Sequence, residues 1–212
     1  MLLRRFARVP PPSLPVGQGG TPEWSDRELV RALELGDPRA GLLLYDRLIR
    51  IVEWTILRIT GQRSSEHEDL VQMAFEQIVV TLHRQRYAHR CSLTSWASAV
   101  SSHVALNALR SQRRRRVSVA ESADGLPEPR ASGDLEDQLA ARQVLERIRH
   151  ELARMNPARA RALVLHEING LELSEIAGVL GISVVAAQSR LSRGRRELIE
   201  RLSSDVGGRP DD

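Results

Sequence analysis

The C-terminal third of the chain contains two short apolar-periodic segments separated by one glycine, and this spacing constrains the fold more than any other feature. The segment from Leu173 to Leu180 predicts one helix, and Gly181 follows it directly. Glycine enters the left-handed backbone region at little cost, so it favours a sharp turn. Ser183 then stands where a helix N-cap is expected, with a hydroxyl that can accept a hydrogen bond from a backbone N–H. The pattern predicts a helix-turn-helix.

The second helix of this pair is predicted to have an apolar face and a polar, basic one. Its inward positions recur at helical spacing: Val184, Ala187, Leu191 and Leu198. Such a helix fits the major groove of DNA, where glutamine and arginine contact base edges through paired hydrogen bonds. An ordinary helical hairpin with a solvated basic face is the alternative. The predicted base-contacting residues are Gln188, Ser189, Arg190, Ser192, Arg193 and Arg196.

Charge is distributed unevenly along the chain. All 31 basic residues are arginine, and the formal net charge is +4. No Asp or Glu occurs from Gln77 to Ala120, and this block includes the consecutive arginines Arg113 to Arg116. A block of one sign and this length predicts a polyanionic partner. A solvated basic face or a localisation tag is the alternative.

The amino-acid composition limits which fold classes and which cellular compartments are expected for this protein. Aromatic residues make up 3% of the chain, and the apolar residues are mostly Leu, Ala, Val and Ile, which favours helical packing. The single cysteine, Cys91, excludes an intrachain disulfide and favours the reducing cytoplasm. No segment has the length and apolarity of a signal peptide or a membrane span, so we expect no membrane insertion.

Helix start and stop signals predict an all-α protein with two small helical domains joined by a flexible linker. Ser25 to Glu28 reads as a capping box, and Asp37-Pro38 and Asn156-Pro157 read as a cap followed by a first-turn proline. Gly36 and Gly61 follow predicted helix ends. The predicted organisation is a disordered tail (1–24), a four-helix domain (25–116), a linker (117–134), a helix-turn-helix domain (135–203) and a second disordered tail (204–212).

Three segments in this order carry a family resemblance. They are EDLVQMAFEQIV (68–79), SLTSWASAVSSHVALNALRSQRRRR (92–116) and GISVVAAQSRLSRGRREL (181–198). Together they resemble the sigma-70 family of bacterial RNA polymerase specificity factors, in its small extracytoplasmic-function (ECF) group. The resemblance covers about residues 25 to 116 and 136 to 202. It implies that the first domain is sigma region 2 and the helix-turn-helix domain is region 4, which contacts the −35 element.

The resemblance also implies a function and partners. A protein of this family binds core RNA polymerase and directs sequence-specific promoter recognition and transcription initiation, with no catalytic activity and no cofactor of its own. An anti-sigma factor is a possible further partner. The first segment resembles the helix that docks on the coiled coil of the polymerase β′ subunit, although the acids there also suit simple helix capping and the phenylalanine also suits the core. The residues implied in polymerase binding are Glu68, Asp69, Gln72 and Phe75.

The second segment resembles the helix that melts the −10 element. Opening DNA requires a place for an unstacked base and a cationic track for the strand, and the loop from Arg90 to Ser95 is a candidate for the first. Trp96 has the spacing of a core residue, with base stacking as the alternative. The family usually has Arg-Asn and Asp at three positions that differ here, which are Ser102, His103 and Asn107. The predicted −10 residues are Arg90, Ser102, His103, Asn107, Arg110, Arg113, Arg114, Arg115 and Arg116.

Two other functions and a metal site are the alternatives to this interpretation. A stand-alone helix-turn-helix transcriptional regulator would bind duplex DNA tightly without polymerase. An enzyme acting on DNA needs a nucleophile with a metal or arginine clamp, and no such set occurs in residues 25–116. The histidines and the cysteine of one region match no common zinc spacing, so we expect no metal site; these are His83, His89, Cys91 and His103.

Overall fold

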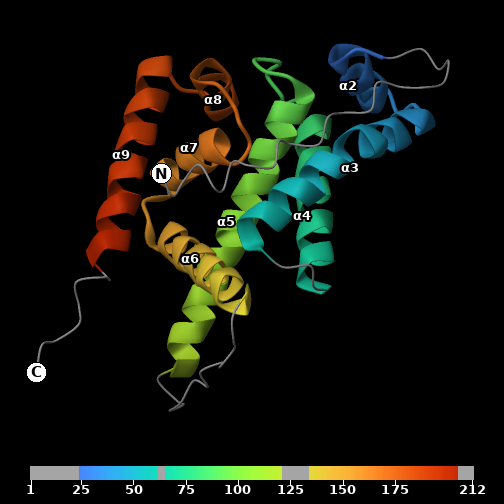
Figure 1. Cartoon of the computed structure of the whole chain (residues 1–212). Coiled ribbons are helices and arrows are strands. Elements are labelled where there is room, and N and C mark those ends of the chain that lie inside the picture. The colour runs from blue at the N-terminus through green and yellow to red at the C-terminus, as the bar shows by residue number, and fades with distance from the viewer. Residues whose placement is uncertain (1–23, 62–64, 121–133, 205–212) are drawn as a thin grey trace, which may run out of the picture.

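The computed structural model describes residues 24–61, 65–120 and 134–204, and every regular element in those ranges is an α-helix (Figure 1). The predicted tails and most of the predicted linker lie outside the described residues. The helices are α2 (Asp26–Glu34), α3 (Pro38–Thr60), α4 (Ser65–His83), α5 (Leu93–Ala120), α6 (Asp134–Arg154), α7 (Pro157–Glu167), α8 (Leu173–Leu180) and α9 (Val184–Ser204).

Helices α2 to α5 form the first helical unit, in which α3 packs mainly against α5. The predicted capping box is present: the Ser25 backbone N–H donates to Glu28 Oε2 at 2.7 Å, and the Glu28 N–H donates to Ser25 Oγ at 3.3 Å. Gly61, with a φ of 79°, ends α3 as predicted. The largest fully buried side chains of this unit come from all four helices: Leu29, Leu44, Leu48, Ile56, Ile59, Ile78, Leu82, Leu93 and Leu106.

Helices α6 to α9 form the second unit, which contains the predicted helix-turn-helix. Asn156 caps α7, and its Oδ1 accepts a hydrogen bond from the Ala158 N–H at 3.0 Å. Gly181 makes the turn between α8 and α9 with a φ of 64°. Ser183 Oγ accepts a hydrogen bond from the Ala186 N–H at 3.2 Å, as expected of an N-cap. Three of the four predicted inward residues of α9 are buried, namely Ala187, Leu191 and Leu198.

Two expectations for these helices are wrong. Val184, predicted to face inward, is 46% exposed. It is the first residue of α9, and the apolar contact at this end comes instead from Ile182 in the turn. Helix α5 also continues to Ala120, although the linker was expected from Val117. No proline or glycine occurs between Arg113 and Ala120, so no residue there interrupts the helix.

The two units are packed against each other, which the sequence did not predict. Helix α5 lies between α3 and α4 on one side and α6, α7 and α8 on the other (Figure 1). Ala99 of α5 is 3% exposed and shares a buried cluster with Leu165 of α7 and Ile176 of α8. Ile148 of α6 belongs to the larger core cluster, which contains residues of both units. The apolar surface of α5 is therefore covered from both sides.

Candidate nucleic-acid and polymerase interfaces

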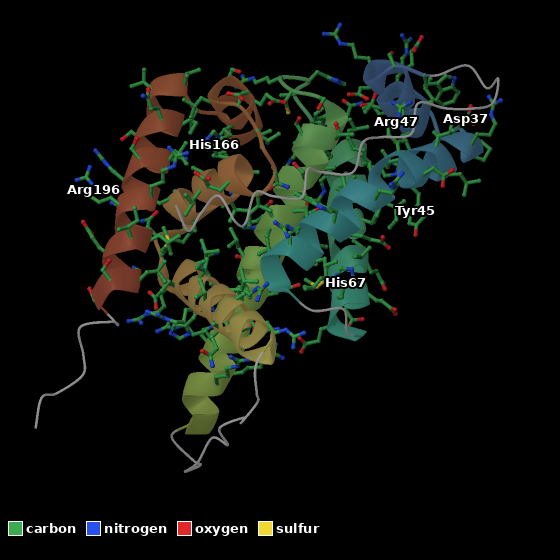
Figure 2. The ribbon with its side chains drawn as sticks, viewed as in Figure 1. Asp37, Tyr45, Arg47, His67, His166 and Arg196 are labelled. Carbon is green, nitrogen blue, oxygen red and sulfur yellow. The ribbon has the colours of Figure 1, made fainter. Side chains whose placement is uncertain are left out.

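The outward face of α9 carries the predicted base-contacting residues. Gly194 lies on the inner face, where a Cβ atom would come within 3.0 Å of the Arg159 carbonyl oxygen, so α9 is held close to α7. Figure 2 shows Arg196 projecting away from the bundle. Among the described residues, no acid forms an ion pair with the arginines at 190, 193 and 196. Four of the predicted residues are exposed (Gln188, Ser192, Arg193 and Arg196), and two are half-buried (Ser189 and Arg190).

A row of polar and basic side chains follows one face of α5. Asn107 Nδ2 lies 3.1 Å from His103 Nε2, and Arg110 Nη1 donates to Asn107 Oδ1 at 3.2 Å. Burial lowers the pKa of the His103 imidazole, and the guanidinium groups of Arg161 and Arg110 lower it further. The ring is therefore neutral at pH 7. The arginine run continues this row, with Arg113 half-buried and Arg114, Arg115 and Arg116 exposed.

Arg161 of α7 brings together two sets of residues that the sequence assigned to different DNA elements. Burial lowers the pKa of the Arg161 guanidinium, and the charges of Arg110 and Arg190 lower it further. Arg110 belongs to the predicted −10 set and Arg190 to the −35 set. The three arginines stay charged at neutral pH, so α5, α7 and α9 contribute to one cationic region. Arg161 was not predicted from the sequence, because a single arginine on a short helix has no distinctive spacing.

Two other predicted −10 residues differ in their exposure to solvent. Arg90 is exposed in the loop before α5. Ser102 is 1% exposed, and its Oγ donates to Asn169 Oδ1 of the second unit at 3.0 Å. In this arrangement Ser102 is not accessible to a nucleic acid. Trp96 is half-buried with its ring centroid 5.1 Å from that of Tyr87, which fits the predicted packing role.

Three of the four predicted polymerase-binding residues line a groove of about 740 Å³ between α3 and α4. Glu68 and Gln72 line it, together with Phe75, whose ring lies 5.0 Å from that of Tyr45 at 33°. Asp69, the fourth, is exposed on α4 but does not line the groove. Tyr45 is 49% exposed and was missed by the sequence analysis, because it follows the buried position Leu44 within a long apolar run. Figure 2 shows Tyr45 and His67 on the two helices that border this groove.

Metal binding and membrane insertion were also considered in the sequence, and the structure bears on both. In the described ranges, no three His, Cys, Asp or Glu side chains converge in a way that could hold a metal ion. Cys91 is half-buried as a free thiol. Burial raises the pKa of this thiol, and the carboxylates of Glu175 and Asp26 raise it further. None of the helices in the described part of the chain combines the length and apolarity needed to cross a membrane.

Comparison with known proteins matches both units to family models. Residues 44–115 match "Sigma-70 region 2", and residues 145–198 match "Sigma-70, region 4". The chain is 28% identical over 190 residues to the ECF RNA polymerase sigma factor SigM of Mycobacterium tuberculosis, covering 88% of this chain and 89% of that protein. It is 30% identical over 135 residues to the RNA polymerase sigma factor CarQ of Myxococcus xanthus, covering 64% of this chain and 74% of CarQ.

A solved structure has a similar fold. CnrH, in complex with the cytosolic domain of CnrY, aligns with a TM-score of 0.50 and 22% sequence identity, covering 85% of this chain and 98% of CnrH. RNA polymerase sigma factor CnrH of Cupriavidus metallidurans also matches in sequence, with 37% identity over 70 residues, or 33% of this chain and 37% of CnrH.

Proposed function

Because this chain belongs to the ECF group of the sigma-70 family, and so directs promoter recognition and transcription initiation with RNA polymerase, we propose which of its surfaces carries each step. The α9 face contacts the −35 duplex. The α5 row holds the −10 strand. The groove between α3 and α4 receives the β′ coiled coil of core polymerase. The chain itself catalyses no reaction and acts in the cytoplasm, where transcription takes place.

The observation that carries the −35 assignment is the outward face of α9. A recognition helix must present donors to base edges without first breaking intramolecular ion pairs. Arg190 and Arg193 have no acidic partner among the described residues, whereas Arg195 of the same helix is paired to Glu167 at 2.6 Å. Arg190 and Arg193 are therefore the leading base-contacting candidates. Gln188, Ser189 and Ser192 complete the face, and Arg196 suits a phosphate contact.

The −10 assignment is supported by the charge of α5. A single strand is held by cations along its backbone and by stacking of its bases. Arg110 and the arginine run supply cations in a helix that carries no acid. Arg90 lies on the adjoining loop, and His103 and Asn107 border the same row. Ser102 can join this set only if the second unit moves away from α5.

The polymerase assignment is supported by an apolar groove with an acidic border. Its lining includes Tyr45 and Phe75, with Glu68 at the edge. An apolar groove of this kind accepts a helix through side chains at helical spacing. Tyr45→Ala is expected to weaken binding of core polymerase at least tenfold. Met73→Ala is the matched control, because Met73 is 47% exposed on α4 but does not line the groove.

Transcription in vitro with purified core polymerase on a library of genomic fragments tests the function as a whole. The expected result is initiation at promoters that share −35 and −10 sequences, together with a stable complex between the chain and core enzyme in gel filtration. A stand-alone regulator would instead bind its duplex sites tightly without polymerase. Failure to associate with core polymerase would overturn the proposal.

An anti-sigma factor is a candidate additional partner. CnrH, which has a similar fold, was solved with the cytosolic domain of CnrY bound. We propose that a protein inhibitor of this kind covers the groove between α3 and α4, in competition with polymerase. Tyr45→Ala should then weaken the binding of both proteins, and retention of inhibitor affinity in that variant would count against a shared site.

A further inference from the structure

The second residue of α9 is an exposed valine that the packing of the protein does not account for. Val185 is 77% exposed, and no large apolar side chain among the described residues is more exposed. Single exposed apolar side chains are common at protein surfaces, so exposure alone does not indicate a site. Val185 differs from the others in its position, because it lies on the helix whose outward face is assigned to the −35 duplex.

Val185 begins the most outward row of side chains on α9. Residues four, seven and eleven positions apart share one face of a helix. Three of the predicted DNA-contacting residues have that spacing from Val185, namely Ser189, Ser192 and Arg196. The opposite side of the helix is buried, with Ala187 0% exposed. At 1.5 Å per residue the row is about 16 Å long, so Val185 is continuous with the proposed −35 face.

The first turn of α9 holds this side chain in a fixed position. Ser183 Oγ accepts a hydrogen bond from the Ala186 N–H at 3.2 Å, and the Ser183 carbonyl oxygen accepts one from the Ala187 N–H at 2.9 Å. A valine in a helix also has one strongly preferred χ1 rotamer. Val185 therefore loses little conformational freedom when it contacts a ligand.

The chemistry of valine selects one feature of the major groove. Its side chain has no hydrogen-bond donor or acceptor, so it cannot bond to a phosphate or to the polar atoms of a base edge. Among the groups that base pairs present in the major groove, the apolar one is the C5-methyl group of thymine. The N-terminal residues of a recognition helix contact the base edges. A valine there gains by packing against this methyl group, whereas a cytosine amino group in its place would lose water without gaining a partner.

We propose that Val185 selects an A·T pair in the −35 element by packing against the C5-methyl group of its thymine. This inference rests on the proposed function, since it takes the outward face of α9 as the surface that contacts the −35 duplex. Arg190 and Arg193 supply hydrogen bonds to neighbouring base edges, and Arg196 at the far end of the row contacts a phosphate. The −35 preference thus combines hydrogen bonds with one apolar contact.

Replacement of single thymines by deoxyuracil tests this contact, because the two bases differ only by the C5-methyl group. The protein is the full chain with core polymerase, and the probe is a promoter fragment in which each thymine on either strand of the −35 element is replaced in turn. At one position, the wild type should bind the substituted promoter about fourfold more weakly, as expected for one buried methyl group. Competition against the unmodified fragment measures this ratio.

Val185→Ala should abolish this dependence on the methyl group. The variant should bind the unmodified promoter about fourfold more weakly than wild type, and the same thymine replacement should then change its affinity less than about 1.5-fold. Folding is preserved, because Val185 is exposed and alanine favours a helix more than valine does. Val184→Ala is the matched control: it makes the same substitution at the preceding residue, which is 46% exposed and lies off the row, and it should keep the fourfold effect.

The outcomes separate this contact from the proposed function. Failure of the wild type to initiate with core polymerase, or initiation that is indifferent to the −35 sequence, overturns the proposed function. Initiation that depends on the −35 sequence, but on no thymine methyl group, overturns the Val185 contact alone. A methyl effect that persists in Val185→Ala overturns it too, because another residue then contacts the methyl group. Equal loss of the effect in Val184→Ala would mean that the start of α9 is disturbed in both variants, and would overturn a contact specific to Val185.

Discussion

The arginines of α9 differ in whether they form ion pairs, and this difference separates structural arginines from proposed DNA-contacting ones. Arg195 Nη2 lies 2.6 Å from Glu167 Oε1, and Arg201 Nη2 lies 3.2 Å from Glu197 Oε1. These two arginines join α9 to its neighbours or stabilise the helix itself. The outward arginines have no such acid among the described residues, so their donors are available to a ligand.

Arg190→Ala is expected to reduce −35-dependent initiation by about ten- to a hundredfold, because one paired base contact contributes about 1–3 kcal/mol. Binding of core polymerase should be unchanged. Initiation rates on matched and scrambled −35 promoters measure the effect. Arg142→Ala is the control, an exposed arginine on α6 outside the proposed DNA face. An equal loss on both promoters would contradict a base-contacting role.

Cys91 offers a native probe of the interface. Burial raises the pKa of its thiol, and Glu175 of the second unit and Asp26 of the first raise it further. Because only the thiolate reacts, alkylation by iodoacetamide should show a midpoint above pH 9.0, the ordinary value for this group. Glu175→Gln should lower the midpoint. A midpoint equal to that of the urea-unfolded chain would show that Cys91 is not buried in solution.

At the scale of elements, α5 carries the signal that could have predicted the interface. Four of its serines are buried: Ser95, Ser98, Ser101 and Ser102. Two of them satisfy their hydroxyls within the helix, since Ser98 bonds to the Ser95 carbonyl at 2.9 Å and Ser101 to the Ala97 carbonyl at 2.9 Å. Small side chains of this kind let a neighbouring helix approach closely. Ser102 was predicted only as a DNA-contact residue, whereas the structure places it in a helix-packing surface.

Local signals predicted most helix ends, whereas long-range packing was not predictable from them. Ser25, Asp37, Asn156 and Gly181 act within a few residues, and each lies at the cap or turn expected of it. Hydrophobic periodicity identifies an apolar face but not the element that covers it. The partner of Asn169 on α3 is 114 residues away in sequence, and no local pattern encodes that pairing. The packing of the two units therefore became apparent only in the structure.

The arginine run of α5 is expected to make the stability of open complexes depend on salt concentration. Replacing Arg113 to Arg116 with alanine should weaken open complexes and flatten their salt dependence. Each phosphate contact on single-stranded DNA contributes about 0.7 to the slope of log affinity against log salt. Four lost contacts would change the slope by up to about 2.8. Complex lifetime measured across a salt series tests this, and an unchanged slope would indicate a run that only faces solvent.

Glu197 of α9 makes the second unit sensitive to acid. Burial raises its pKa, but hydrogen bonds from Arg159 Nη1 at 2.8 Å, the Asn156 N–H at 3.3 Å and Arg201 Nη2 at 3.2 Å lower it more, for a net pKa below 4.5. Because its pKa is lowered on folding, the ionised Glu197 carboxylate stabilises the folded state. This contribution is fully present above about pH 4.5, the ordinary pKa of the group, and is lost as pH falls through the lower folded pKa.

Thermal unfolding between pH 3 and pH 7 should therefore show a smaller pH dependence in Glu197→Gln than in wild type. The difference should appear only in the acidic part of this range, where the wild-type carboxylate takes up a proton. Glu200→Gln is the control, an exposed acid on the same helix. Identical pH dependence in wild type and Glu197→Gln would exclude a contribution from this carboxylate.

On the scale of the whole molecule, opposing forces act across the interface. The buried hydrogen bonds each contribute about 1 kcal/mol net, and burial of Ala99 and Ile148 adds to them. Arg110, Arg161 and Arg190 repel one another across the same interface. The balance of these terms, rather than any one contact, sets how firmly the two units are held together.

Removing one repelling charge should therefore stabilise the packing of the two units. Arg161→Gln keeps a long polar side chain but removes the charge whose pKa burial, Arg110 and Arg190 lower. Because burial and the neighbouring arginines disfavour the charged form, the variant should unfold at a higher temperature, measured by thermal denaturation. Arg142→Gln, which removes an exposed charge from α6, should leave the unfolding temperature unchanged. A lower unfolding temperature in Arg161→Gln would mean that this arginine stabilises the interface and that repulsion does not weaken it.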